Sequence, residues 1–321
     1  MNKYAAVLWV TSLGMGTQCV FAQNYPNRVI RLVVPSSPGG GTDIIGRIIA
    51  QKLSEQLGQQ VVVENRAGAG TIIGNEAVAK SAPDGYTLLM GLSTLAINPS
   101  MYAKLPYDAL RDFAPISQAV SSPNILTLHP SVPAKTVKEF VTLAKAKPGS
   151  ITFGSAGMGT SPHLSGELLK TLAKIDIVHV PFKGSGQSII SQLAGEIAAN
   201  FPSVPTALPY IKANRLRGLG VTTSKRTQAL PDVPSIAEAG VPGYEATQWF
   251  GVLAPAGTPR AIVERLYQET SRALRSAEVK ERVIGEGMEV VAGTPEDFAA
   301  YIKSETEKWQ KVIKSAGIKP Q

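Results

Sequence analysis

Cysteine is almost absent from this 321-residue chain, and its one cysteine, Cys19, lies near the N-terminus. The residues before it, Gly16, Thr17 and Gln18, lack the aliphatic residue and small pair of a lipoprotein signal. We therefore predict no lipid anchor at Cys19. The chain after residue 22 has no cysteine at all. This excludes disulfides, thiolate nucleophiles and cysteine metal ligands, so a hydrophobic core must stabilise that part.

Histidine and recognisable catalytic motifs are also scarce. The chain has three histidines, and none stands at metal-ligand spacing from another. It has no phosphate-binding loop, and Ser155 has Phe153 where the first glycine of a Gly-x-Ser-x-Gly elbow belongs. A hydrolase that uses His163 with Ser155 or Ser161 stays an alternative, but no acid is positioned to orient the histidine. We therefore predict no enzyme, no catalytic residue, no cofactor and no metal site.

Charged residues are rare at the N-terminus, where only Lys3 precedes Arg28. The apolar stretch at residues 4–13 is too short to span a bilayer, which needs about 20 residues. Residues 20–22 fit a small-residue cleavage site. This pattern predicts that residues 1–22 are a signal peptide for export to the periplasm, with a retained membrane anchor as the alternative.

Acidic residues are fewer than basic ones, 24 against 32, which makes the formal net charge +8 and the isoelectric point about 9.5. The basic residues are scattered, and no cluster of them interleaves with aromatic residues. This distribution predicts no nucleic-acid partner. A diffuse positive field that favours anionic ligands is the simpler interpretation.

Short apolar runs alternate with segments of helical period, a pattern typical of α/β proteins. Residues 29–35, 61–64 and 86–91 predict strands, and apolar residues at helical spacing over 44–57 predict a buried helix. About 300 residues exceed the usual size of one domain. The sequence therefore predicts two lobes with mainly parallel sheets. Helix starts are predicted at Thr136, Thr258 and Thr294, and the last helix is expected to bury Phe298, Ile302, Glu305, Trp309 and Ile313.

Two glycine-rich turns, residues 38–43 and 154–162, each stand between an expected strand and an expected helix. Glycine lets backbone N–H groups approach a ligand closely, and a helix N-terminus favours an anion. One such turn in each lobe would make an anion-binding cleft. The alternative is that both are simply tight connections.

Several side chains near these turns allow two interpretations. His163 could donate a ring N–H to a bound anion or pack in the helix. Asp43 is interpreted as a helix cap, or else it borders water around the ligand. Lys183 could neutralise a ligand carboxylate or face solvent. His129 and His179 stand in apolar surroundings and are interpreted as structural.

Six short blocks follow one another in an order and spacing typical of one receptor family. They are Val34 to Asp43, Glu64 to Gly70, Gly154 to Thr160, Val180 to Gly184, Leu230 to Pro234 and Ala254 to Pro259. Through these blocks the chain resembles the Bug family, the substrate-binding receptors of tripartite tricarboxylate transporters. The resemblance covers nearly the whole chain after residue 22.

The resemblance implies a type II periplasmic-binding-protein fold with the ligand in a cleft at the hinge between two lobes. The first lobe would comprise residues 23–121 and 252–321, and the second residues 122–251, with chain crossings near residues 122 and 250. Closure of the lobes by a hinge motion would bury the ligand.

The resemblance also implies the binding residues, which belong to the two glycine turns and to neighbouring loops. They are Pro38, Gly39, Gly40, Gly41, Thr42, Asp43, Thr71, Ser93, Thr94, Ser155, Ala156, Gly157, Thr160, Ser161, His163, Lys183, Gly184 and Ser203.

One position departs from the family pattern. Many relatives have an acidic residue after the phenylalanine of a Phe-Asp-Asn/Ser stretch, whereas Pro202 follows Phe201 here. Because such an acid could pair with a ligand ammonium, its absence favours a dicarboxylate, a hydroxy acid or an aromatic carboxylate. The expected partners are this small carboxylate and the membrane subunits of a tripartite tricarboxylate-type transporter, with the protein itself a monomer. A sensor that presents its ligand to a membrane kinase is the alternative.

Overall fold

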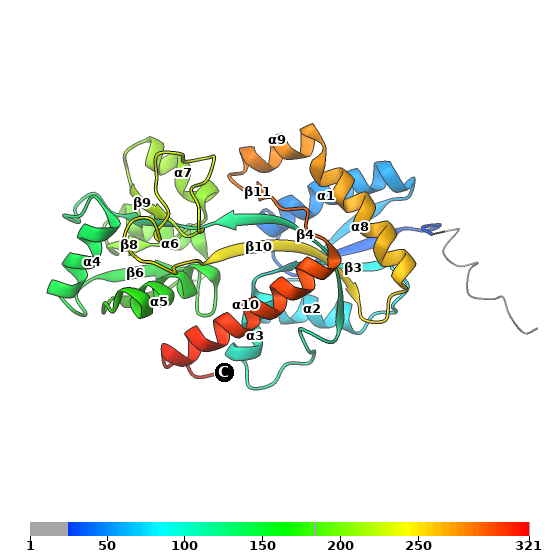
Figure 1. The fold of residues 1–321 in the computed structure, drawn as a ribbon, viewed down its shortest axis with the longest axis horizontal. Helices are drawn as coiled ribbons and strands as arrows, with labels where there is room; N and C mark the ends of the chain where they lie inside the picture. The colour runs from blue at the N-terminus through cyan, green and yellow to red at the C-terminus, as the bar shows by residue number, and fades with distance from the viewer. Residues whose placement is uncertain (1–24, 183, 321) are drawn as a thin grey trace, which may run out of the picture.

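The chain forms two α/β lobes that lie side by side (Figure 1). The computed structural model describes residues 25–182 and 184–320. The predicted signal peptide and Lys183 therefore lie outside the described residues.

The first lobe is built on a six-stranded sheet in the order β11-β4-β10-β3-β1-β2. Its strands are β1 (Ile30–Val34), β2 (Val61–Asn65), β3 (Thr87–Leu92), β4 (Phe113–Pro123), β10 (Thr247–Pro255) and β11 (Glu289–Val290). Its helices are α1 (Gly41–Leu57), the 3₁₀ turn η1 (Ala69–Thr71), α2 (Ile72–Ala79), α3 (Thr94–Met101), α8 (Arg260–Arg275), α9 (Ala277–Gly285) and α10 (Pro295–Ser315).

The second lobe is built on a five-stranded sheet in the order β7-β6-β8-β5-β9. Its strands are β5 (Ile125–Leu128), β6 (Thr152–Ser155), β7 (Val178–Pro181), β8 (Ala199–Asn200) and β9 (Arg217–Val221). Its helices are α4 (Val137–Ala146), α5 (Ser161–Ala173), α6 (Ser185–Leu193) and α7 (Val204–Lys212).

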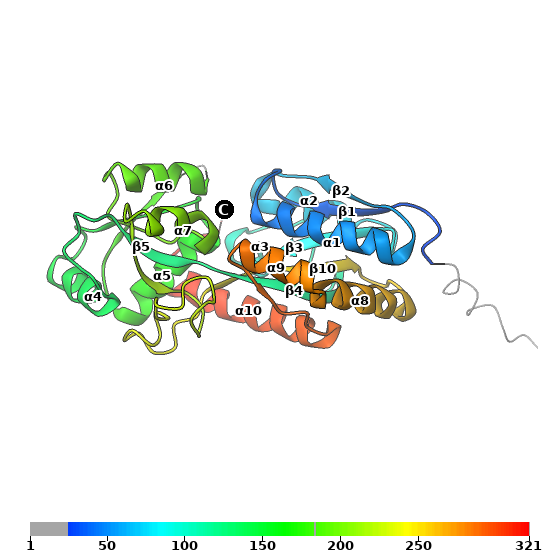
Figure 2. The same ribbon diagram turned by 90° about the horizontal axis from the view of Figure 1, so that it is seen from above.

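Both sheets are mixed, which corrects the expectation of mainly parallel sheets. Strand β1 runs parallel to β2 and β3, and β6 runs parallel to β7 and β8, but the remaining strand pairs are antiparallel. The reason is the path of the chain between the lobes. Strand β4 leads out of the first lobe and β10 leads back beside it in the opposite direction, as Figures 1 and 2 show.

The predicted elements form where local patterns are strong. The predicted first strand is β1, and the predicted helix over residues 44–57 is part of α1, which buries Ile45, Ile48 and Leu53 and ends at Gly58 with a left-handed φ of 65°. Thr136 and Thr294 cap their helices as predicted. Thr258 does not, because α8 begins after Pro259 and the Thr258 hydroxyl donates to the Pro255 carbonyl instead.

Helix α10 packs against both lobes. Its predicted apolar stripe is confirmed: Phe298 and Ile302 are buried in a core of the first lobe, whereas Trp309 and Ile313 share the core of the second lobe. The helix therefore lies along the junction, beneath β10 in the view of Figure 1. The predicted lobe boundaries at residues 122 and 251 stay a prediction.

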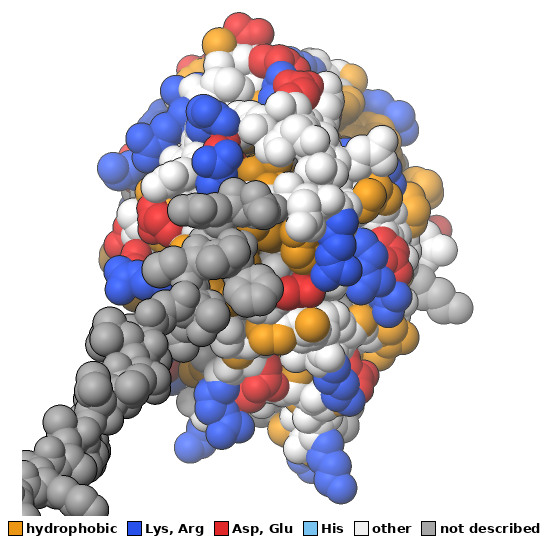
Figure 3. Space-filling view, turned by 90° about the vertical axis from the view of Figure 1, so that its right-hand side faces the viewer, with side chains coloured by type: hydrophobic (Ala, Val, Ile, Leu, Met, Phe, Trp, Pro, Cys, Tyr) orange, Lys and Arg blue, Asp and Glu red, His pale blue; other side chains and the backbone are white. Residues whose placement is uncertain are grey.

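The outer face of the first lobe carries charges of both signs. On the face of the first lobe shown in Figure 3, Lys and Arg side chains are interspersed with Asp and Glu. In the part of the chain that the structure describes, every helix is too short or too polar to cross a bilayer. Within the same residues, no three His, Cys, Asp or Glu side chains gather where a metal ion could bind.

Candidate ligand-binding cleft

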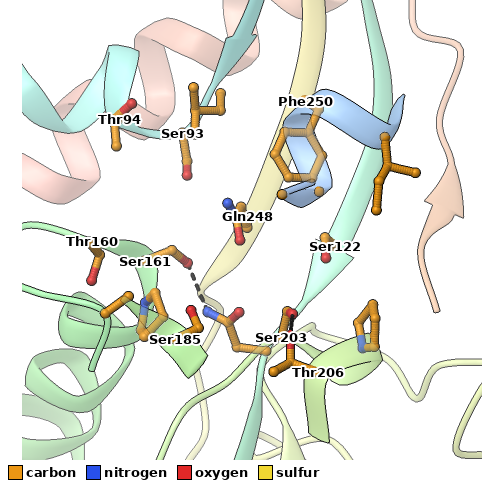
Figure 4. A pocket seen from close by; sticks show the side chains of 18 of the residues that line it. Ser93, Thr94, Ser122, Thr160, Ser161, Ser185, Ser203, Thr206, Gln248 and Phe250 are labelled. Atoms are coloured by element: carbon orange, nitrogen blue, oxygen red, sulfur yellow. Dashed lines mark hydrogen bonds between the residues drawn. The ribbon is translucent and has the colours of Figure 1, made fainter. Parts of the chain in front are cut away.

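A cleft of about 510 Å³ lies between the two lobes, a volume suited to a small molecule. Residues from both lobes line it, as the labelled side chains in Figure 4 show. Gln248 of β10 and Ser122 of β4 face each other as paired strand residues at the chain crossings. The cleft is therefore formed by the crossings and by the loops of each lobe that flank them.

Six helices begin at this cleft. In the first lobe, Gly40, Thr71 and Ser93 are the N-cap residues of α1, α2 and α3, and all three line the cavity. In the second lobe, Thr160 and Ser203 are the N-caps of α5 and α7 and also line it. Helix α6 contributes its first residues, Ser185 and Gly186. The positive ends of six helix dipoles thus converge on one space.

The cleft combines this positive field with very few charged side chains. Glu286, after the end of α9, is the one charged side chain among the described residues that line it. Among the described lining residues, the groups that could hold a bound anion are therefore backbone N–H groups, hydroxyls and amides. Helix N-termini bind carboxylates and phosphates in this way.

The cleft also has apolar side chains from both lobes in its lining. Ile44, Leu92, Pro205, Phe250 and Met288 line it. The start of α1 lies against two of them, since a Cβ atom on Gly41 would lie 3.3 Å from both Met288 Cε and Phe250 Cζ. Glycine at that position leaves room for the apolar side chains, which can contact the carbon skeleton of a ligand.

Asp43 positions the first glycine loop and does not line the cavity. Its Oδ2 accepts hydrogen bonds from the Gly39 N–H at 2.9 Å and from Arg47 Nε at 3.0 Å, and its Oδ1 accepts one from Asn65 Nδ2 at 2.9 Å. Burial alone would raise the pKa of this carboxyl, but the three hydrogen bonds outweigh burial and hold the pKa below its usual range. Asp43 is therefore an ionised residue that orders the loop. The N-cap of α1 is Gly40, and Asp43 lies in the first turn, where it accepts the N–H of Gly39 from outside the helix.

Ser155 and His163 also lie behind the loop rather than in the cleft. The Ser155 hydroxyl lies 2.6 Å from His179 Nε2 and donates to the Gly157 carbonyl, and its oxygen accepts from the Gly157 N–H. His163 stacks on His179 with ring centroids 4.0 Å apart, and its Nδ1 accepts from the Gly159 N–H. These side chains fix the shape of the second glycine loop from within.

Burial controls the charge of this histidine pair. It lowers the pKa of His163 to about 3, with the neighbouring His179 and Lys170 contributing further, and it lowers the pKa of His179 to about 4. Both rings are therefore neutral near pH 7, so neither provides a cation for a ligand.

The structure brings together ten of the predicted residues in the cavity lining. They are Gly39, Gly40, Gly41, Thr71, Ser93, Thr94, Ala156, Thr160, Ser161 and Ser203. Seven others lie outside the lining, namely Pro38, Thr42, Asp43, Ser155, Gly157, His163 and Gly184, and Lys183 is not described. Most of these seven adjoin lining residues but turn toward the protein interior.

Several lining residues were not predicted. They are Ile44, Gly70, Leu92, Ser122, Asn124, Pro162, Ser185, Gly186, Pro205, Thr206, Gln248, Phe250, Glu286 and Met288. The available signals were polar residues at the expected chain crossings, namely Ser121, Ser122 and Asn124 at the first and Gln248 at the second. Polar residues where the chain passes between lobes have little reason to be there unless they face the cleft.

Comparisons with known proteins agree with this geometry. The family described as "Tripartite tricarboxylate transporter family receptor" matches residues 45–318. Protein BugT of Bordetella pertussis is 38% identical over 323 residues, which cover 99% of this chain and 99% of BugT. Such relatives are solute-binding receptors and not enzymes, as the sequence predicted.

Solved structures resemble the whole described fold. The structure of R. palustris Rpa4515 with adipate is 37% identical, with a TM-score of 0.83, and the match covers 92% of this chain and 100% of that one. The structure of MatC from Rhodopseudomonas palustris with bound malate is 31% identical, with a TM-score of 0.78, and the match covers 90% of this chain and 100% of MatC. The predicted two-lobed periplasmic-binding-protein fold is thereby confirmed.

Proposed function

Because the chain belongs to the family of tripartite tricarboxylate transporter receptors, we propose that it binds one small carboxylate in the cleft and delivers it to the membrane subunits of such a transporter. Receptors of this family are periplasmic. The proposed location of this chain is accordingly the periplasm, after removal of residues 1–22.

The convergence of six helix N-termini on a cleft whose described lining has no lysine or arginine carries the proposal. A carboxylate in this position would accept hydrogen bonds from first-turn amides and from the hydroxyl of Ser93. Ser93 supports this reading because its hydroxyl is buried and has no partner among the described residues. A neutral or cationic ligand would leave these donors and dipoles without a counterpart.

We propose that the lobes meet at the crossings near residues 122 and 250 and close around the ligand. Strands β4 and β10 are the covalent links there, and their facing residues Ser122 and Gln248 line the cleft. A small change at these links would alter the width of the cleft between the lobes.

The proposed ligand class is a dicarboxylate, a hydroxy acid or an aromatic carboxylate. A volume of about 510 Å³ accommodates each of them. The apolar side chains of Phe250, Met288 and Ile44 suit a carbon chain or ring beside the bound carboxylate. The related structures with adipate and with malate support a carboxylate of this size.

A thermal-shift screen of small carboxylates tests the function. A ligand that binds only the folded protein stabilises it by about 2.7 kcal/mol when its concentration is one hundred times the dissociation constant. At least one carboxylate is expected to raise the melting temperature, while matched amines and neutral sugars leave it unchanged. Stabilisation by amines or sugars alone would refute the carboxylate proposal.

A further inference from the structure

We propose that the cleft selects carboxylates that also carry a hydroxyl group, and that this hydroxyl donates a hydrogen bond to Oδ1 of Asn124. The inference rests on the proposed function, since it assumes that the ligand is a carboxylate held in this cleft. It narrows the ligand class to hydroxy acids and names a residue that distinguishes them from their deoxy analogues.

Asn124 occupies a rigid position at the junction of the lobes. It lies between β4 and β5, lines the cleft and has a side chain that is fully buried. Its backbone N–H donates to Thr222 Oγ1 at 2.9 Å, and its carbonyl accepts from the Thr222 N–H at 2.9 Å. Asn124 also forms an isolated antiparallel bridge with Ser203, another lining residue. The side chain therefore has little freedom to move away from the cavity.

The hydrogen bonds of Asn124 determine which way its amide points. Nδ2 donates to Ser161 Oγ at 2.8 Å, the dashed contact in Figure 4, and to Ser165 Oγ at 3.3 Å. The Ser165 hydroxyl in turn donates to the Ser161 carbonyl, so it can only accept from Asn124. This assigns the nitrogen to the side of α5. The oxygen must then occupy the other side of the amide plane.

That oxygen has no donor among the described residues. Buried carbonyl oxygens are almost always hydrogen-bonded, so an unpaired acceptor on a cavity wall points to a partner inside the cavity. The carboxylate of a ligand cannot be that partner, because an ionised carboxylate only accepts hydrogen bonds. We therefore assign this donor to an O–H or N–H group that the ligand carries in addition to its carboxylate.

A hydroxyl fits this position better than an ammonium. Three lining serines are linked to Asn124: Ser161 by a hydrogen bond, Ser203 by the isolated bridge and Ser122 as a near neighbour in the chain. All three carry neutral hydroxyls, and the one acidic residue in the described lining, Glu286, belongs to the end of α9. Burying an ammonium group without an opposite charge is costly, whereas a hydroxyl needs only one acceptor and one donor. Ser161 can supply that donor, since its oxygen accepts from Asn124 and its own proton stays available.

Calorimetric titration of the purified exported protein with matched pairs tests the inference. The pairs are malate with succinate, 3-hydroxybutyrate with butyrate, and 4-hydroxybenzoate with benzoate. In at least one pair the hydroxylated member is expected to bind about tenfold or more tightly than its deoxy partner. Methoxysuccinate, which keeps the oxygen but cannot donate, is expected to bind no better than succinate, and aspartate no better than malate.

Two variants separate a specific contact from a structural role. Asn124→Leu removes Oδ1, so the ratio of the two dissociation constants in the discriminating pair should fall to about one. Ser165→Ala removes a partner of Asn124 on the side away from the cavity and should leave that ratio unchanged. If Asn124→Leu does not fold, the methoxysuccinate comparison in the parent protein decides the question.

The outcomes distinguish the two proposals. Binding of carboxylates without preference for the hydroxylated members, or with preference for aspartate, overturns the hydroxyl assignment and leaves the receptor function standing. A ratio that survives in Asn124→Leu overturns the role of Asn124. Failure of every carboxylate to bind overturns the proposed function and the inference with it.

Discussion

Ser93, which directly follows β3, and Ser155, the last residue of β6, are both buried, but their hydroxyls differ in pairing. The Ser155 hydroxyl bonds to His179 and to both backbone groups of Gly157. The Ser93 hydroxyl lines the cavity and has no partner among the described residues. The first therefore contributes to the folded state, and the second is available to a ligand.

Substitution of each serine by alanine should separate these roles. Ser155→Ala leaves buried groups unpaired and should lower the free energy of unfolding by about 1 to 3 kcal/mol. Ser93→Ala should leave ligand-free stability unchanged or slightly raised, but should weaken carboxylate binding by about 1.5 to 3 kcal/mol. Chemical denaturation and calorimetric titration measure the two effects. If the two variants changed stability equally and binding equally, the assignment of Ser155 to folding and of Ser93 to ligand binding would be wrong.

Gly40→Val tests whether the first glycine loop contacts the ligand. The φ of Gly40 is −82°, which any residue adopts, and a Cβ atom there would meet nothing closer than the Ser37 carbonyl oxygen at 3.8 Å. The variant should therefore fold like the parent. Its side chain would enter the cavity, and we expect a loss of at least about 2 kcal/mol in binding, roughly thirtyfold in dissociation constant.

The matched control is Gly293→Val. Gly293 lies outside the cavity lining, and a Cβ atom there would make ordinary contacts at 3.7 Å. Titration calorimetry should show parental affinity for this control. Parental affinity in Gly40→Val as well would remove the first loop from the binding site.

At the level of elements, the start of α5 is held by the stacked rings of His163 and His179. His163 lies on α5 and His179 on β7, so the stack joins a helix to the neighbouring edge strand. Through Gly159 and Ser155 the same rings hold the second glycine loop. The neutrality of both imidazoles is thus a condition for the shape of one cleft wall.

This stack predicts a specific loss of stability in acid. Because burial lowers the pKa of His163 to about 3 and of His179 to about 4 from the ordinary 6.5, the unfolded chain takes up protons at a higher pH than the folded protein. The pair's contribution to the free energy of unfolding is complete above pH 6.5. It is lost progressively as the pH falls below 6.5 and through 4 and 3, the pKa values in the folded protein.

Denaturant unfolding at a series of pH values measures this effect. The free energy of unfolding should decline from about pH 6.5 downward, and His179→Gln should make that decline shallower. His129→Gln serves as the control, since His129 bonds to Ser131 in a different part of the second lobe. Identical pH profiles for the parent and His179→Gln would exclude the stack as the cause.

At the scale of the whole molecule, α10 joins the two lobes outside the strand crossings. Its first half packs with Trp249 of β10, and its second half places Trp309, Val312 and Ile313 in the core of the second lobe. Trp309 is fully buried and donates its indole N–H to Glu305 at 2.9 Å. The lobes therefore share one helix in addition to two strands.

Trp309→Ala should destabilise the protein by about 3 to 5 kcal/mol, because it opens a cavity in the core at the junction. Gln310→Ala, on the exposed side of the same helix, should change stability by less than about 0.5 kcal/mol. Thermal unfolding followed by circular dichroism measures both. A small effect of Trp309→Ala would mean that the end of α10 detaches without consequence for the second lobe.

Local patterns were sufficient for much of the fold. The spacing of Ile45, Ile48 and Leu53 predicted α1, and Thr136 and Thr294 marked helix starts, because capping and helical periodicity depend on residues within one turn of each other. Thr258 failed as a cap because α8 begins one residue later than predicted, with Pro259 as its N-cap. The strand directions were not predictable, since pairing of β4 with β10 joins residues more than a hundred positions apart.

For the binding site, the sequence by itself determined the glycine turns, the helix starts beside them and the near absence of catalytic and metal-binding groups. Only the tertiary structure decided which side chains face the cleft. Ser155 and His163 turn inward because burial and hydrogen bonds, to His179 and to the Gly159 N–H respectively, stabilise them there. Asn124 and Gln248 reach the cavity because β4 and β10 cross between the lobes side by side. A turn is a local property of the chain, whereas a cavity wall is made by segments that meet only when the chain folds.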